Sequence, residues 1–205
     1  MNNHRPLIGV LALQGDFAEH VAVLTRLEAR TREVRLPEQL EGLDGLIIPG
    51  GESTTIARLM LRWSLLEPIR RRAREGMAVW GTCAGAILLA ERTADLDREG
   101  LRLMDIAVER NAFGRQVDSF EADIDVAGLP DGRFHAIFIR APVIERAGAS
   151  VEVLATLADG SIVAAREGAL LATSFHPELT GDARFHRLLV GLAEAWRKGR
   201  SGPSK

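Results

Sequence analysis

Cys83 is the only cysteine in this 205-residue chain, and it stands at the centre of the stretch Gly81-Thr82-Cys83-Ala84-Gly85. Free cysteine is among the most buried residue types, so a place in the core is one interpretation. The pattern G-x-C-x-G favours another, because it is the cysteine form of the nucleophile elbow, a tight turn between a strand and a helix. The start of that helix would favour a thiolate and point backbone N–H groups at an oxyanion. Cys83 is therefore a candidate nucleophile.

A cysteine nucleophile needs a base, and the base needs a group that orients it. His176 directly follows the apolar stretch 169–175 and stands two residues before Glu178. In extended backbone, residues i and i+2 face the same way, so the imidazole and the carboxylate are expected to lie side by side. Glu178 would then hold the tautomer of His176 and stabilise its protonated form. The remaining histidines are expected to be structural: His4, His20, His135 and His186.

Other polar residues follow apolar runs in a similar way. The pair Gly50-Gly51 lets backbone approach a ligand closely and can donate N–H groups, and Ser53 is a candidate cap for the next helix. Arg110 and Arg140 are candidates for binding a carboxylate, although surface arginines are common. The pattern G-x-x-x-x-G-K-[ST] is absent, and a single cysteine excludes a disulfide framework or a Cys-x-x-Cys metal or redox motif.

Predicted strands alternate with predicted helices in the first half of the chain, and these elements must position the candidate residues. Apolar runs typical of buried strands are each followed by apolar residues at helical spacing, which predicts a three-layer α/β fold with a mostly parallel sheet between helices. Sheets of this kind bind ligands at the carboxyl ends of their strands. Strands are expected at 7–13, 31–36, 45–51 and 77–81, and helices at 17–29, 55–63, 66–76 and 84–92.

The second half is different, with short alternating segments between about 103 and 172 that predict some antiparallel strands. Asp159-Gly160 indicates a hairpin, and the amphipathic stretch 182–199 predicts a final helix. We expect one domain over residues 1–205, with a disordered tail at 199–205.

Composition narrows the choice of partners and location. A net charge of −2 gives no reason to expect nucleic acid or a membrane surface as a partner. The basic run at 70–74 fits a solvated helix face better than a docking surface for a protein partner. No apolar run approaches the length of a membrane span, and the N-terminus lacks the features of a signal peptide. A lone cysteine fits a reducing compartment, so we expect a cytoplasmic protein.

Six stretches, in this order, resemble a known family: ALQGDFAEH, LIIPGGESTT, WGTCAGAILLA, ERNAFGRQVDSFEA, FIRAP and SFHPELT. The chain resembles, over about residues 7 to 197, the glutaminase subunits of pyridoxal 5′-phosphate synthase, a branch of the class I (triad) glutamine amidotransferases. The resemblance implies a flavodoxin-like fold and hydrolysis of L-glutamine to glutamate and ammonia. It also implies a partner, a (β/α)8-barrel synthase subunit, and no metal or organic cofactor.

The resemblance assigns roles residue by residue. Cys83 matches the nucleophile of the family, His176 its general base and Glu178 its orienting carboxylate. The positions that match contacts with bound glutamine are Gly51, Glu52, Ser53, Arg110, Ile139 and Arg140.

The same resemblance implies an oxyanion hole from backbone N–H groups near Gly50, Gly51 and Ala84, and it places Gln14 near the active site and the synthase interface. Ile87 departs from many class I relatives, which carry glutamine four residues after the nucleophile. That difference favours the vitamin B6 branch.

Two other functions stay open at this point. The chain could serve another amidotransferase, such as imidazole glycerol phosphate synthase. It could also be a non-catalytic stress protein in which Cys83 senses oxidants, but that interpretation leaves His176 and Glu178 unexplained.

Overall fold

The computed structural model describes residues 5–93, 100–110 and 119–201. Strands and helices alternate through the first half of the chain, as the apolar pattern predicts. The elements there are β1 (Leu7–Leu11), α1 (Phe17–Arg26), β2 (Arg30–Val34), the 3-10 helix η1 (Pro37–Leu40), β3 (Gly45–Ile48), α2 (Ser53–Arg62), α3 (Leu66–Arg74), β4 (Ala78–Thr82) and α4 (Ala84–Leu89).

The second half consists mainly of strands and closes on a long helix. None of the helices in the described part of the chain is long and apolar enough to cross a membrane. The elements are β5 (Ala90–Thr93), β6 (Met104–Glu109), β7 (Ser119–Ile124), β8 (Phe134–Ile139), β9 (Val143–Ala147), β10 (Glu152–Thr156), β11 (Ile162–Glu167), β12 (Leu170–Thr173), the 3-10 helix η2 (Pro177–Leu179) and α5 (Arg184–Ser201).

The main sheet has the strand order β2-β1-β3-β4-β12-β11-β9-β6-β5, with β10 paired to β11. Its first five strands are parallel, while β9, β11 and β12 join one another and β6 through antiparallel pairs. The hairpin predicted at Asp159-Gly160 joins β10 and β11. A second, two-stranded antiparallel sheet is formed by β7 and β8. The predicted mixture of parallel and antiparallel strands is confirmed.

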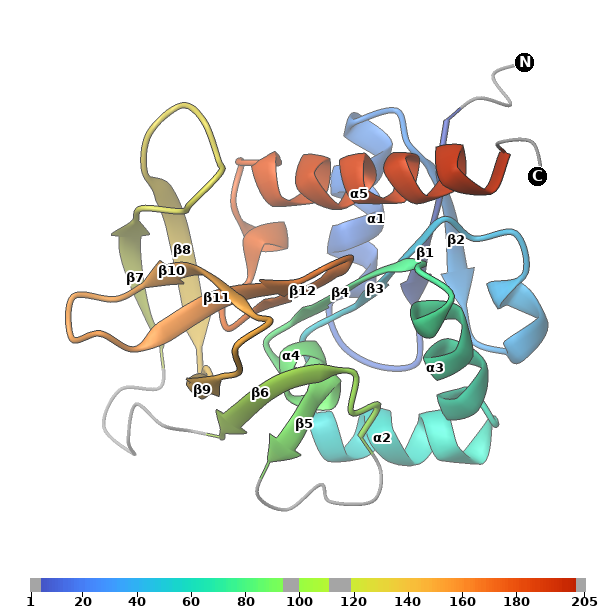
Figure 1. Cartoon of the computed structure of the whole chain (residues 1–205), viewed down its shortest axis with the longest axis horizontal. Coiled ribbons are helices and arrows are strands. Elements are labelled where there is room, and N and C mark those ends of the chain that lie inside the picture. The colour runs from blue at the N-terminus through green and yellow to red at the C-terminus, as the bar shows by residue number, and fades with distance from the viewer. Residues whose placement is uncertain (1–4, 94–99, 111–118, 202–205) are drawn as a thin grey trace.

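Helices cover both faces of the parallel part of the sheet, so the expected three layers are present (Figure 1). Alternate strand residues point to opposite faces: Ile47 packs in the core beneath α1 and α5, whereas Leu46 and Ile48 pack in the core beneath α2, α3 and α4. Trp80 of β4 is fully buried on the α5 side, where its ring stacks on Phe185.

Two glycines fix the distance between α4 and the sheet. A Cβ atom on Gly85 would lie 2.0 Å from the carbonyl oxygen of Ile48, and one on Gly81 would lie 2.3 Å from the carbonyl carbon of Gly85. Both contacts are with backbone, which cannot move aside as a side chain can. The glycines on either side of Cys83 are therefore required by the close packing of helix and strand, in addition to any freedom they give the turn.

The structure corrects several sequence predictions. The helix expected at 84–92 ends at Leu89, because the next residues form β5 and pair with β6. Ser53 is the first residue of α2 and Glu52 precedes it as the N-cap residue, so Ser53 is not the cap. Helix α5 continues to Ser201, so residues 199–201 of the expected disordered tail are helical, and residues 202–205 lie outside the described part.

Candidate active site

Cys83 lies in the turn between β4 and α4, at the carboxyl end of a central strand. Its backbone angles, φ 46° and ψ −103°, are strained for a residue with a side chain. The backbone N–H of Cys83 donates to the carbonyl of Thr173 at 2.8 Å, which ties the turn to β12. The sulfur lies 3.9 Å from the carbonyl oxygen of Ile139, within the distance at which a thiol donates a weak hydrogen bond. These contacts hold the strained turn and direct the sulfur into a pocket.

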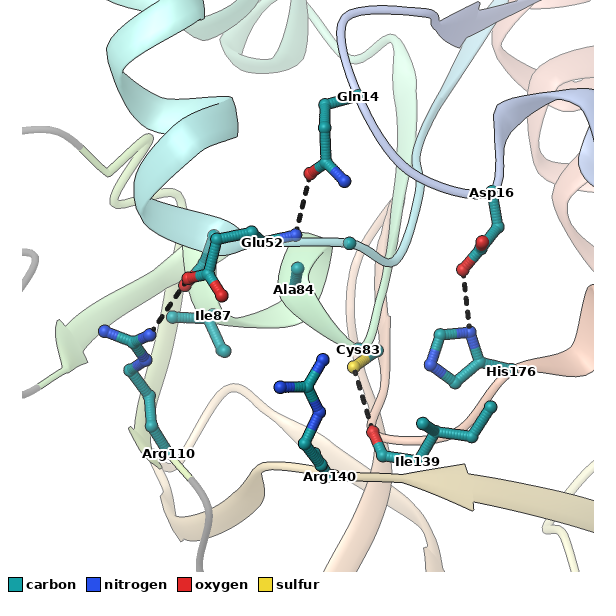
Figure 2. A pocket seen from close by; sticks show the side chains of 12 residues that line it. Gln14, Asp16, Glu52, Cys83, Ala84, Ile87, Arg110, Ile139, Arg140 and His176 are labelled. Carbon is teal, nitrogen blue, oxygen red and sulfur yellow. Dashed lines mark hydrogen bonds and ion pairs between the residues drawn. The ribbon is translucent and has the colours of Figure 1, made fainter. Parts of the chain in front are cut away.

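His176 lies next to Cys83, and Glu178 lies next to His176, as the sequence predicts. Nδ1 of His176 and Oε1 of Glu178 are 2.7 Å apart, and both side chains are buried. The route by which they meet differs from the one expected. Strand β12 ends at Thr173 and Glu178 belongs to η2, so a turn brings the imidazole and the carboxylate together, and not an extended strand. Figure 2 shows the other ring nitrogen of His176 on the side of the ring that faces Cys83.

The groups around His176 raise the pKa of its imidazole. Burial alone would lower the pKa of the imidazole, but hydrogen bonds with Asp16, Cys83 and Glu178 outweigh it and raise the pKa of His176 to about 12. Burial raises the pKa of the Glu178 carboxyl, against the opposing effect of the hydrogen bond from His176. The imidazole is therefore protonated at neutral pH when the groups around it are negative.

Asp16 is a site residue that the sequence did not predict. Its Oδ2 atom lies 3.3 Å from Nδ1 of His176, so the imidazole faces a second carboxylate (Figure 2). The approach depends on Gly50, since a Cβ there would come within 2.4 Å of the imidazole and 3.2 Å of the Asp16 carboxylate. A faint signal exists in the sequence, because Asp16 ends the loop after β1 at the same edge of the sheet as Cys83.

A pocket of about 370 Å³ opens above these side chains. It contains Cys83 and His176, while Glu178 lies behind His176 and does not line it. Of the residues named from the sequence, Gln14 and Ala84 also line the pocket, and so does Ile87. Each of the six expected glutamine contacts is present in its wall: Gly51, Glu52, Ser53, Arg110, Ile139 and Arg140.

The wall of the pocket opposite His176 is organised around Glu52. Its carboxylate forms an ion pair with Arg110 at 3.2 Å, and its backbone N–H donates to the side-chain oxygen of Gln14 at 2.7 Å (Figure 2). Arg140 follows β8 with φ 42°, another strained position, and its side chain points toward the pocket. Two guanidinium groups thus face one pocket, which suits a ligand with a carboxylate. Residues 111–118, the middle of the motif ERNAFGRQVDSFEA that contains Arg110, lie outside the described part.

Among the described residues, a single set of three could hold a metal ion: Asp16, His176 and Glu178, with ligand atoms within 4.8 Å of one another. A metal on Nδ1 of His176 would displace the proton that this nitrogen shares with Glu178. The hydrogen-bonded pair and a bound metal are thus mutually exclusive, and the short contact between His176 and Glu178 favours the pair.

The three-layer fold, with a mostly parallel sheet between helices, is that of the class I glutamine amidotransferases. Cysteine, histidine and glutamate come together at the carboxyl ends of its strands. The chain belongs to the SNO glutamine amidotransferase family, whose model matches residues 10–194. The family resemblance drawn from the motifs is thereby confirmed.

Relatives and solved structures agree with this assignment. The chain is 62% identical over 188 residues to the pyridoxal 5′-phosphate synthase subunit PdxT of Herpetosiphon aurantiacus, covering 90% of this chain and 99% of the relative. It is 56% identical over 187 residues to the protein of the same name from Roseiflexus sp., covering 90% and 99%.

A crystal structure of a glutamine amidotransferase superposes with a TM-score of 0.86 at 53% identity, over 91% of this chain and 98% of that one. The crystal structure of a putative GMP synthase protein from Thermoplasma acidophilum superposes with a TM-score of 0.73, over 98% of this chain and all of that one. At 20% identity, that second likeness concerns the fold alone.

Proposed function

We propose that this protein hydrolyses L-glutamine to L-glutamate and ammonia, with Cys83 as nucleophile, His176 as general acid and base, and Glu178 as the orienting carboxylate. The observation that carries the proposal is the position of Cys83. It lies on a strained turn that faces a pocket, within hydrogen-bonding reach of a histidine that is itself paired with a buried carboxylate. A cysteine that only filled space in the core would need none of these contacts.

The reaction then runs through a thioester. The Cys83 thiolate attacks the side-chain amide carbon of glutamine, and the carbonyl oxygen becomes an oxyanion. When this intermediate collapses, the C–N bond breaks and the imidazolium of His176 gives its proton to the leaving nitrogen, which departs as ammonia. Neutral His176 next takes a proton from water, and the hydroxide attacks the thioester. The C–S bond breaks, the thiolate is restored, and the product carboxylic acid ionises to glutamate.

Backbone N–H groups stabilise the oxyanion in this scheme. Ala84 begins α4, so its N–H has no acceptor within the helix and lies at the positive end of the helix dipole. Gly51 lines the pocket opposite, with φ 149°, a conformation that suits glycine. We assign the oxyanion hole to these two groups and the region of Gly50. Arg110 and Arg140 bind the α-carboxylate of glutamine, with Glu52, Ser53 and Ile139 completing the substrate contacts.

The ammonia serves a second protein. Relatives 62% and 56% identical to this chain are named subunits of pyridoxal 5′-phosphate synthase, and both are covered almost completely by the match. We infer that this chain supplies ammonia to a (β/α)8-barrel synthase subunit that makes pyridoxal 5′-phosphate. An enclosed transfer suits the chemistry, because free ammonia at neutral pH is mostly ammonium. A cytoplasmic location fits a nucleophile that must remain a reduced thiol.

The alternatives raised by the sequence are not favoured. Both relatives described above are synthase subunits of the vitamin B6 branch, and neither they nor the family model point to imidazole glycerol phosphate synthase. A stress protein with a redox-sensing Cys83 would need neither the buried pair of His176 and Glu178 nor the two arginines in the pocket.

The test is a glutaminase assay of the protein with and without the synthase subunit of the same organism. Wild type is compared with Cys83→Ala and His176→Asn, and with Cys83→Ser as a nearly isosteric control. We expect glutamate to form in the wild-type complex and to fall to background in the first two variants. Glutamate formation that survives Cys83→Ala would overturn the proposal.

A further inference from the structure

His20 lies directly behind the proposed triad, although the sequence marks it only as a structural residue of an amphipathic helix. It belongs to α1 and is fully buried. Its Nε2 atom lies 3.3 Å from Oε2 of Glu178, the carboxylate oxygen that His176 does not use. In the described part of the chain, Oε2 is a buried oxygen without an aligned hydrogen-bond donor. A buried carboxylate oxygen left in this state is costly, and Nε2 of His20 lies within ion-pair distance of it.

His20 is held by two further buried groups. Its Nδ1 atom lies 2.9 Å from Nε2 of His186 in α5, and its Nε2 atom lies 3.3 Å from the hydroxyl of Thr82, the residue before Cys83. The Trp80 ring makes T-shaped contacts with both His20 and His186 and closes the space around them. His20 therefore sits between the nucleophile turn and η2, in a position set by elements from both halves of the chain.

The contacts select one tautomer for the two histidines. If Nδ1 of His20 carried the proton, His186 would have to carry its own on Nδ1, which is buried without a partner, and Nε2 of His20 would turn a lone pair toward Glu178. With the protons on both Nε2 atoms, His186 donates to His20, and the N–H of His20 faces Glu178 and Thr82. Apart from Oε2 of Glu178, which has no aligned donor in either tautomer, this arrangement leaves only a lone pair of His186 unsatisfied. That costs less than a buried N–H or a lone pair facing a carboxylate.

Both rings are neutral, which this tautomer requires. Burial, then the neighbouring His186 and His176, lowers the pKa of His20 well below its ordinary value. Burial and Arg26 lower the pKa of His186 to about 3. Among the described residues, the titratable groups that act on His20 are His186, His176 and Glu178. A neutral donor can hold the carboxylate without competing with the imidazolium of His176 for its charge.

We propose that His20 is a positioning residue for the reaction: its Nε2–H holds the outer oxygen of Glu178, so that the inner oxygen stays turned toward His176. His186 fixes the tautomer in which His20 can do this. The inference rests on the proposed roles of Cys83, His176 and Glu178, and it adds two residues that no pocket contact reveals, because neither His20 nor His186 lines the pocket.

Two amide substitutions separate positioning from packing. The side-chain nitrogen of glutamine can occupy the place of Nε2, whereas that of asparagine reaches only the place of Nδ1. We expect His20→Gln to keep kcat of the synthase complex within about threefold of wild type, and His20→Asn to lower it about tenfold or more, as loss of a hydrogen bond to a charged group implies. KM for glutamine should stay within about twofold in both, because His20 does not reach the pocket.

The rate of Cys83 alkylation by iodoacetamide at neutral pH gives a readout that does not need glutamine turnover. We expect it to fall in His20→Asn and not in His20→Gln, because a displaced Glu178 stabilises the imidazolium of His176 less. If the wild-type complex lacks Cys83-dependent glutaminase activity, the proposed function fails, and the alkylation rates still decide the role of His20.

A second comparison uses the next residue away from the triad, with His186→Gln and His186→Leu. It tests the inference even if a His20 variant fails to fold. Glutamine keeps the donor to Nδ1 of His20 and should leave the alkylation rate near wild type, whereas leucine should slow it. His135→Gln, on the surface, is the control for a histidine substitution as such. Equal behaviour of the Gln and Asn variants of His20, in folded proteins with matching thermal melts, would overturn the inference.

Discussion

Nδ1 of His176 lies 2.7 Å from Oε1 of Glu178, and both side chains are buried beneath the pocket. Glu178→Gln keeps the shape of the side chain and removes its charge, so the imidazolium loses a charge-assisted partner. Such a hydrogen bond contributes about 1.5–3 kcal/mol, so we expect kcat to fall about tenfold to a hundredfold. KM should change less than about twofold, because Glu178 does not line the pocket. Steady-state glutaminase kinetics of the synthase complex measure both, with exposed Glu38→Gln as control.

Asp16 approaches the same nitrogen of His176 at 3.3 Å, but its side chain is 39% exposed. Water screens such a charge, so Asp16→Asn should lower kcat only about twofold to fivefold. When Glu178 is already glutamine, Asp16 is the remaining carboxylate at Nδ1. We therefore expect Asp16→Asn to cost more in the Glu178→Gln background than in wild type. A double-mutant cycle on kcat measures this coupling. Effects that simply multiply would mean that Asp16 does not share the imidazole with Glu178.

The difference between these two carboxylates also shows what the sequence can predict. Glu178 is two residues from His176, and a local pattern is enough to associate them. Asp16 is 3.3 Å from His176 only because β1 and β12 lie in one sheet with their carboxyl ends at the same edge, and because Gly50 has no side chain in between. Those conditions depend on strand order, which no local pattern contains.

The same difference between local patterns and contacts across the fold explains which helices and strands the sequence predicts correctly and which it does not. The buried strands and the amphipathic helices were predictable, since their apolar periodicity reflects the face that each one buries. Helix α4 was predicted too long because Ala90, Glu91 and Arg92 suit a helix well, yet pairing with β6 draws them into β5. His20 was interpreted as structural for a similar reason: its burial is visible in the helical pattern, but its contact with Glu178 is between distant segments.

The backbone contact between α4 and β3 gives a stability prediction. A Cβ on Gly85 would lie 2.0 Å from the carbonyl oxygen of Ile48, so Gly85→Ala must move the helix that carries the nucleophile turn. We expect a loss of about 1–3 kcal/mol or more in the free energy of unfolding, together with a lower glutaminase rate. Gly191→Ala is the matched control, because Gly191 lies in α5 with open space around it. There alanine should stabilise by about 0.5–1 kcal/mol. Urea unfolding measures both, and a neutral Gly85→Ala would contradict the close packing.

The two buried neutral histidines make the stability of the fold depend on pH. The pKa of His186 falls from 6.5 to about 3 on folding, mainly through burial, and that of His20 also falls. Between pH 6.5 and 3 the unfolded chain therefore binds protons that the folded chain does not, and stability decreases as the pH falls, by up to about 1.4 kcal/mol per pH unit for each ring. The raised pKa of Glu178 acts in the opposite direction, because the folded carboxyl takes up its proton first. The raised pKa of His176 contributes stability that is fully present below pH 6.5 and is lost toward pH 12, so it does not alter the acid slope.

His186→Gln removes one titrating ring and leaves the rest in place. Between pH 6.5 and 5, the free energy of unfolding of this variant, measured in urea, should therefore decrease less steeply with falling pH than that of wild type. The difference in slope should be close to the contribution of one proton, about 1.4 kcal/mol per pH unit. Parallel curves would mean that His186 has the same pKa in the folded and the unfolded chain.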